Sequence, residues 1–172
     1  MRWYIPFNRV SRRQRSIIDG VSSRANKAKN YWIRGFAGSG KTLVLVHVME
    51  TVLAREPSAR IAFITFTNAL TSLIIDGFNR SDYEHEVEVI THTKFLNKCK
   101  KENLTYDWVF LDEIQDIETN DLEKINQFGN CVVAAGDIEQ TIYPDRVSEN
   151  NIDNLLKPLW VVELTEVFRL TP

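Results

Sequence analysis

The sequence has few of the features that mark several large classes of protein. Only two of its 172 residues are cysteines, Cys99 and Cys131, and they form neither a CxxC pair nor a metal-binding spacing. A disulfide-stapled scaffold is therefore excluded, and buried thiols in a reducing cytosol are expected. No apolar run approaches the roughly 18 residues that span a bilayer, and the N-terminus lacks the apolar core of a signal peptide. We therefore expect a cytoplasmic protein that has no membrane partner.

The composition is typical of a globular protein with an uneven charge distribution. Repeats and Gly/Ser-rich linkers are missing, and 44% of the residues are hydrophobic against 26% charged. The formal net charge is -2, yet residues 1–41 carry ten Lys/Arg and one acid, whereas residues 42–172 carry eleven Lys/Arg and twenty-two acids. A segment as basic as the first could contact a polyanion or form a solvated helix face, and charge alone leaves both interpretations open.

Short runs rich in β-branched and aromatic residues alternate with stretches of helical periodicity. The predicted strands are Tyr31–Arg34, Arg60–Thr65, Val87–Ile90, Trp108–Leu111, Cys131–Ala135 and Trp160–Leu164. The predicted helices are Lys41–Ala54, Ala69–Phe78, Thr93–Lys101 and Thr119–Phe128. A further helix begins near Ser11, which fits a capping box with Gln14. The alternation predicts the α/β class: one domain over residues 1–172, with a mainly parallel sheet covered by helices on both faces.

Residues 35–42 read GFAGSGKT and match the phosphate-binding motif GxxxxGK[ST] in full. A predicted strand precedes the motif and a predicted helix follows it, which is the context that the motif requires. Glycines let the backbone turn its N–H groups toward an anion, and the helix N-terminus adds partial positive charge. Lys41 would reach the β and γ phosphates, and Thr42 would bind Mg²⁺ through its hydroxyl. The residues expected to bind ATP are Gly35, Gly38, Ser39, Gly40, Lys41 and Thr42.

A second candidate site follows the apolar strand at residues 106–111, which ends in Asp112 and Glu113. Ligands bind at the carboxyl ends of strands in open α/β sheets, and we expect this strand to neighbour the one before the phosphate loop. Asp112 would hold Mg²⁺, and Glu113 would orient and deprotonate the attacking water. The alternative is that the two acids cap a helix. A nucleoside-monophosphate kinase also uses a phosphate loop, but the two adjacent acids favour an enzyme that hydrolyses the nucleotide.

Residues 112–116 (DEIQD) resemble the DExQD box of superfamily 1 helicases, and the similarity is greatest to the UvrD/Rep-like branch. Other segments resemble that family's motifs in the same order along the chain. They are residues 10–14 (VSRRQ), 63–68 (FITFTN), 90–93 (ITHT), 136–143 (GDIEQTIY) and 164–169 (LTEVFR). This resemblance, from about Val10 to Arg169, implies a RecA-like ATPase that couples hydrolysis to movement along single-stranded DNA, with RNA not excluded.

The resemblance also implies roles for single residues. Gln14 would read the adenine and Phe168 would pack on it, whereas Gln140 and Arg169 would contact the γ-phosphate. Structural roles stay open as alternatives to these nucleotide contacts. Gln14 also fits the capping box, Phe168 suits a hydrophobic core and Arg169 suits a surface ion pair. The residues implied in nucleic-acid binding are Phe66, Asn68, His92 and Tyr143. For these aromatic residues a core position is the alternative, and for His92 it is a structural hydrogen bond.

The sequence departs from the family at two positions, because Ala69 replaces a usual Lys and Asp145 replaces a usual Trp. The family places a second RecA-like domain after this segment, so we expect such a domain beyond residue 172 as the partner of a first motor domain. Alone, the first domain should hydrolyse slowly and unwind nothing. A regulatory ATPase that does not translocate is the alternative, and a plain nucleic-acid-binding module, based on the basic segment, is the third.

Overall fold

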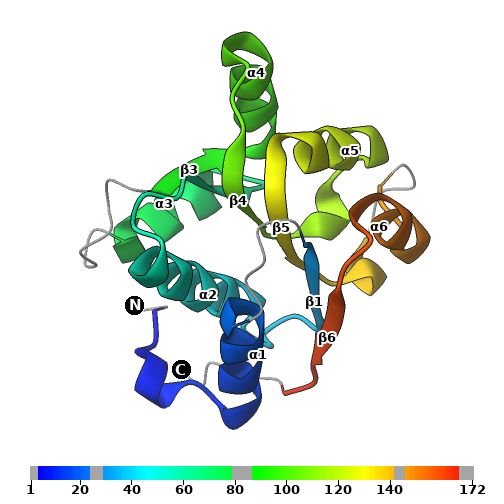
Figure 1. Cartoon of the computed structure of the whole chain (residues 1–172). Coiled ribbons are helices and arrows are strands. Elements are labelled where there is room, and N and C mark those ends of the chain that lie inside the picture. Colours follow the sequence, from blue (N-terminus) through cyan, green and yellow to red (C-terminus); the bar gives the residue numbers. More distant parts are fainter. Residues whose placement is uncertain (1–3, 24–28, 79–86, 142–145, 167–172) are drawn as a thin grey trace.

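A computed structural model describes residues 4–23, 29–78, 87–141 and 146–166 (Figure 1). In these ranges the chain forms a six-stranded, all-parallel sheet with the order β3-β2-β4-β5-β1-β6. The strands are β1 (Tyr31–Gly35), β2 (Ile61–Thr65), β3 (Val87–Thr91), β4 (Tyr106–Leu111), β5 (Gly129–Gly136) and β6 (Trp160–Leu164). All six predicted strands are confirmed, and with them the α/β class.

Helices cover both faces of this sheet (Figure 1). The α-helices are α1 (Arg12–Ser23), α2 (Lys41–Arg55), α3 (Asn68–Phe78), α4 (His92–Glu102), α5 (Thr119–Phe128) and α6 (Glu149–Leu156). Three short 3-10 helices lie between them: η1 (Phe7–Arg9), η2 (Ile114–Asp116) and η3 (Ile138–Gln140). Among the described helices, none has the length and hydropathy needed to cross a membrane.

Two hydrophobic cores, one on each face, hold the layers together. Alternate strand residues point to opposite faces, so Phe110 packs in the core under α1, α2 and α3, while Leu111 packs in the core under α4, α5 and α6. All five residues of β2 are buried, as expected for an inner parallel strand covered on both faces. Cys99 and Cys131 are free thiols in these cores, which confirms their predicted burial.

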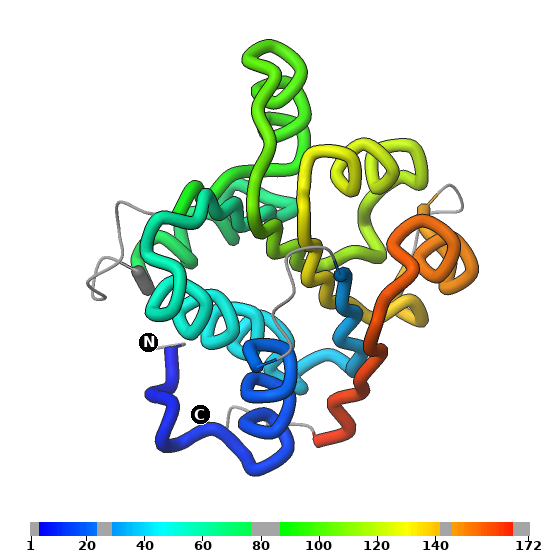
Figure 2. The backbone as a smooth tube through the Cα atoms, in the orientation of Figure 1, coloured from blue at the N-terminus to red at the C-terminus, as the bar shows by residue number. Residues whose placement is uncertain are grey.

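The prediction that β4, which precedes Asp112, is the neighbour of β1, which precedes the phosphate loop, is wrong. β5 lies between β1 and β4 and pairs in parallel with both (Figure 2). The end of β5 is built from small residues, Ala134, Ala135 and Gly136. Because these residues project little, side chains that follow β4 can reach across β5 toward the phosphate loop.

Helix α6 is absent from the predicted helices because its signal is short. Ser148 Oγ accepts a hydrogen bond from the Asn151 amide, and Asn151 Oδ1 accepts one from the Ser148 amide. This is a capping box with Asn in the place that Glu or Gln usually takes. Only two residues of the helix, Ile152 and Leu156, are buried, so its apolar periodicity spans a single turn.

Candidate nucleotide site

The phosphate loop connects β1 to α2, as its motif predicts. Gly38 and Gly40 have φ angles of 77° and 84°, in the left-handed region that side chains with a Cβ rarely adopt. At Gly40 a Cβ would also lie 2.5 Å from Gln14 Nε2. The loop conformation therefore depends on glycine at both positions.

Lys41 begins α2 and turns its side chain back into the loop. Its Nζ donates hydrogen bonds to the carbonyls of Gly35 at 2.8 Å and Phe36 at 3.2 Å, and only 7% of the residue is exposed. The ammonium group is therefore held at the mouth of the loop, where the motif places the lysine that contacts phosphates.

The two residues predicted to bind a metal ion lie in direct contact. Thr42 Oγ1, on the first turn of α2, donates a 2.6 Å hydrogen bond to Asp112 Oδ2, which follows β4 on the far side of β5. Asp112 is 1% exposed, and its Oδ1 accepts a hydrogen bond from the Glu113 amide. Hydroxyl and carboxylate oxygens form the donor set that Mg²⁺ prefers. Residues 70 positions apart in sequence thus converge at one point.

Burial, and to a smaller extent the neighbouring Glu113 charge, raise the pKa of the Asp112 carboxyl to about 7. The hydrogen bonds from Thr42 and the Glu113 amide, together with the charge of Lys41, oppose this effect. Removal from water outweighs them because a buried carboxylate loses its hydration. Without a cation, Asp112 is therefore partly protonated near neutral pH.

This pKa predicts a pH dependence of stability in the absence of Mg²⁺ and nucleotide. An unfolded Asp has a pKa of about 3.9, so between about pH 4 and pH 7 the folded chain binds more protons at Asp112 than the unfolded chain. The free energy of unfolding should therefore fall as the pH rises through this window. Asp112→Asn should remove that slope and stabilise the chain at pH 8 by roughly 2–4 kcal/mol. Urea titrations at several pH values measure this, and equal slopes for both proteins would contradict it.

Glu113 and Gln140 are linked through two residues to which sequence reasoning gave no role. Gln115 Nε2 donates to Glu113 Oε2 at 2.7 Å, and Gln115 Oε1 accepts from the Asp137 amide at 3.1 Å. Gln140 Nε2 then donates to Asp137 Oδ2 at 2.6 Å. The place of Gln115 in the DEIQD box and of Asp137 in GDIEQ was visible in the sequence, but their pairing depends on β4 and β5 being neighbours.

Gln14 joins α1 to the phosphate loop. Its backbone N–H donates to Ser11 Oγ at 3.1 Å and its Oε1 accepts from the Ser11 amide at 3.0 Å, which confirms the capping box. Its Nε2 donates to the carbonyl of Ser39 at 3.1 Å. Gln14 is 2% exposed, so it packs directly behind the loop. Its role toward an adenine stays a prediction.

Three of the residues implied in nucleic-acid binding lie at the carboxyl ends of β2 and β3. The rings of Phe66 and His92 are stacked, with centroids 5.4 Å apart and planes 3° from parallel. Burial lowers the pKa of His92, which favours the neutral ring. Asn68 begins α3 and is exposed, next to Ala69. The remaining predicted residues lie outside the described part of the chain: Tyr143, Phe168 and Arg169.

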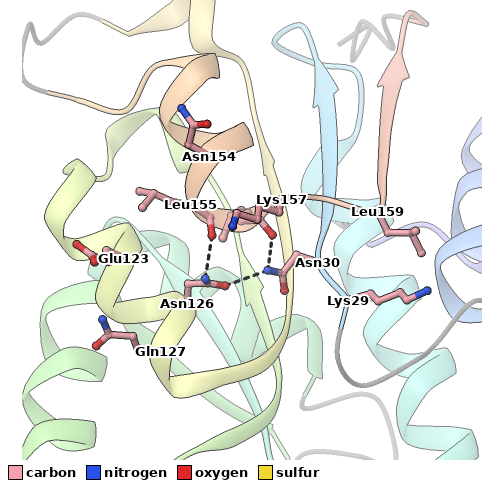
Figure 3. A pocket seen from close by; sticks show the side chains of 10 residues that line it. Lys29, Asn30, Glu123, Asn126, Gln127, Asn154, Leu155, Lys157 and Leu159 are labelled. Carbon is pink, nitrogen blue, oxygen red and sulfur yellow. Dashed lines mark hydrogen bonds between the residues drawn. The ribbon is translucent and has the colours of Figure 1, made fainter.

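A cavity of about 610 Å³ lies at the amino ends of β1 and β6, which is the edge of the sheet opposite the phosphate loop (Figure 3). Its central amides bond to one another, since Asn30 Nδ2 donates to Asn126 Oδ1 at 2.9 Å and to the Leu156 carbonyl at 2.7 Å. Asn126 Nδ2 donates to the Leu155 carbonyl at 2.9 Å. These bonds brace β1 against α5 and α6, and we interpret the amides as structural.

A family model described as an AAA domain matches residues 18–146, which include the phosphate loop, Asp112 and Glu113. The chain belongs to the AAA domain family. Its members are P-loop NTPases, and a P-loop NTPase domain binds a nucleotide, typically together with Mg²⁺. No curated protein matches the chain.

Solved structures show the same fold at low identity. The Pif1 helicase from Candida albicans matches with a TM-score of 0.64 and 18% identity, over 93% of this chain and 40% of that one. The Hef helicase domain from Pyrococcus furiosus matches with a TM-score of 0.61 and 15% identity, over 90% of this chain and 39% of that one. Domain III of the replication initiation protein DnaA from Thermotoga maritima matches with a TM-score of 0.56 and 16% identity, over 92% of this chain and 65% of that one. The fold is thus RecA-like, and the chain spans about two fifths of the length of the two helicase chains.

Proposed function

We propose that residues 1–172 form one RecA-like domain that binds and hydrolyses Mg-ATP, and that it is the first motor domain of a UvrD-like superfamily 1 DNA helicase or translocase. The observation that carries the nucleotide site in this proposal is the contact between Thr42 and Asp112 across β5, beside the buried ammonium of Lys41. It brings the phosphate loop close to Asp112, which we propose as a cation ligand with Thr42, and to the adjacent acid Glu113. The order of the motifs along the chain supports the helicase part. Movement along DNA would require a second RecA-like domain that closes on the nucleotide.

The residues of the site have distinct roles in this proposal. The loop residues Gly35–Gly40 present backbone amides to the phosphates, and Lys41 neutralises their charge. Thr42 and Asp112 would hold Mg²⁺, which supplies charge neutralisation at the phosphoryl oxygens when it is bound. Glu113 orients a water molecule and takes its proton, and Gln140 reports the state of the γ-phosphate. Gln14, Phe168 and Arg169 would contact the adenine and the γ-phosphate.

Turnover of Mg-ATP by the chain, with and without single-stranded DNA, tests this proposal. We expect slow hydrolysis that DNA increases, because a motor domain couples the two ligands. Failure to bind Mg-ATP would contradict the nucleotide site itself. Hydrolysis that no single strand stimulates, in the chain or in a longer protein that contains it, would favour the alternative of a regulatory ATPase that does not translocate.

This proposal assigns the contact with single-stranded DNA to Phe66, Asn68, His92 and Tyr143. Phe66 is partly buried against the core and its ring stacks on that of His92. An aromatic ring that stacks on a base contributes about 1–3 kcal/mol to binding. Phe66→Ala should therefore weaken binding of a labelled oligonucleotide by roughly 5- to 150-fold and reduce the stimulation of turnover. Leu159→Ala removes a side chain that is 47% exposed and lies outside the basic segment, so it is the control and should leave binding unchanged. Equal affinities of the Phe66 variant and the wild type would exclude this surface.

A further inference from the structure

Gln115 is a buried amide between the ends of β4 and β5 that the proposed catalytic steps leave without a role. It is 4% exposed and lies on η2, directly after the pair Asp112 and Glu113. Both ends of its amide are used. Nε2 donates to the Glu113 carboxylate at 2.7 Å, and Oε1 accepts from the Asp137 amide at 3.1 Å.

The chemistry of these partners determines the orientation of the Gln115 amide. If the group were rotated by 180°, its oxygen would face the Glu113 carboxylate and its NH₂ would face the Asp137 N–H, so that acceptors and donors would meet in like pairs. The space around the amide is also restricted. A Cβ on Gly136 would lie 2.5 Å from Gln115 Oε1 and 2.7 Å from Ile114 Cγ2. Because Gly136 at the end of β5 has no side chain, there is space for the Gln115 amide.

The bonds of Gln115 connect two loops that carry different functions. On one side is Glu113, the proposed base. On the other side, Asp137 accepts from the Glu139 amide at 3.2 Å through Oδ1 and from Gln140 Nε2 at 2.6 Å through Oδ2. A continuous hydrogen-bonded path thus runs from the proposed base to the proposed γ-phosphate sensor. Because of these bonds, a displacement of the η3 loop would move the Asp137 N–H and, through Gln115, the Glu113 carboxylate.

We propose that Gln115 is a positioning residue that fixes the Glu113 carboxylate relative to the loop that carries Asp137 and Gln140. This inference rests on the proposed function, because positioning matters only if Glu113 acts on water. Two substitutions separate the two bonds. Gln115→Ala removes both, whereas Gln115→Glu keeps an oxygen that accepts from the Asp137 amide and replaces the donor to Glu113 by a second carboxylate.

Turnover, nucleotide binding and amide hydrogen exchange test the proposal together. Loss of a group that orients a catalytic residue costs about 10- to 100-fold in activity, and we expect that decrease in kcat for Gln115→Ala and at least as much for Gln115→Glu. The Kd for Mg-ATP should stay within about threefold of the wild type, since the side-chain hydrogen bonds of Gln115 go to Glu113 and Asp137, which lie outside the phosphate loop. Exchange of the Asp137 amide should accelerate about tenfold or more in Gln115→Ala and stay near the wild-type rate in Gln115→Glu.

Asn126→Ala is the matched control, because it removes a bonded amide at the opposite edge of the sheet (Figure 3). It should leave kcat unchanged at temperatures where both proteins are folded. A kcat for Gln115→Ala within about twofold of the wild type, or a Kd that rises in step with the fall in kcat, would overturn the positioning role. If the wild-type chain does not hydrolyse ATP, the proposed function fails. Unchanged exchange of the Asp137 amide in Gln115→Ala would then overturn the link itself.

Discussion

We expect Glu113→Gln to reduce Mg-ATP turnover by about 10²- to 10⁴-fold and to leave nucleotide binding nearly unchanged. Glutamine has the shape of glutamate and still offers an oxygen to Gln115 Nε2, so the local hydrogen bond survives. It cannot take a proton from water, which is the step that Glu113 performs in the proposed mechanism. Phosphate release measures turnover, and titration with a fluorescent ATP analogue measures the Kd.

The matched control for this variant is Glu123→Gln on α5. Glu123 is exposed and lines the cavity at the opposite edge of the sheet (Figure 3). The same loss of one negative charge there should change neither turnover nor affinity. Turnover that survives in Glu113→Gln would show that another group takes the proton, while the assignment of the nucleotide site would stand on the binding data.

The second large effect should come from Lys41→Met, which removes the ammonium and keeps a side chain of similar length. Charged hydrogen bonds contribute about 1.5–3 kcal/mol, so the Kd for Mg-ATP should rise roughly 10- to 150-fold. Lys29→Met, a surface lysine before β1, is the control and should bind Mg-ATP like the wild type. Equal affinities of the two variants would mean that Lys41 bonds only to its own loop, as it does to the Gly35 and Phe36 carbonyls.

Most secondary structure elements were predictable because their signals are local. The run at Trp108–Leu111 predicted a strand, and β4 begins two residues earlier, at Tyr106. The glycines at positions 35, 38 and 40 predicted a loop that bends around an anion, and Gly38 and Gly40 have the positive φ angles that glycine readily adopts. Helix α6 shows the limit of such signals, since its eight residues offer one turn of apolar periodicity and a cap that uses Asn instead of Glu or Gln.

The candidate site was predictable as a set of residues but not as an arrangement. Asp112 and Thr42 were assigned to one cation from their motifs, and their contact required a strand between them that the sequence did not place there. Gln14 illustrates a different case, because its capping bonds are local and its bond to the Ser39 carbonyl is not. Gln115 had no assigned role, because its second partner lies 22 positions away.

The sequence by itself determined the α/β class, the strands and the phosphate loop, because hydrophobic periodicity and the need for glycine act over a few neighbouring residues. Only the tertiary structure decided that β5 separates β1 from β4, that Thr42 meets Asp112 across it, and that Gln115 joins Glu113 to Asp137. Strand order and side-chain contacts of this kind depend on pairing between distant segments. Several orders satisfy the same local pattern, and burial of both faces in the complete domain selects one of them.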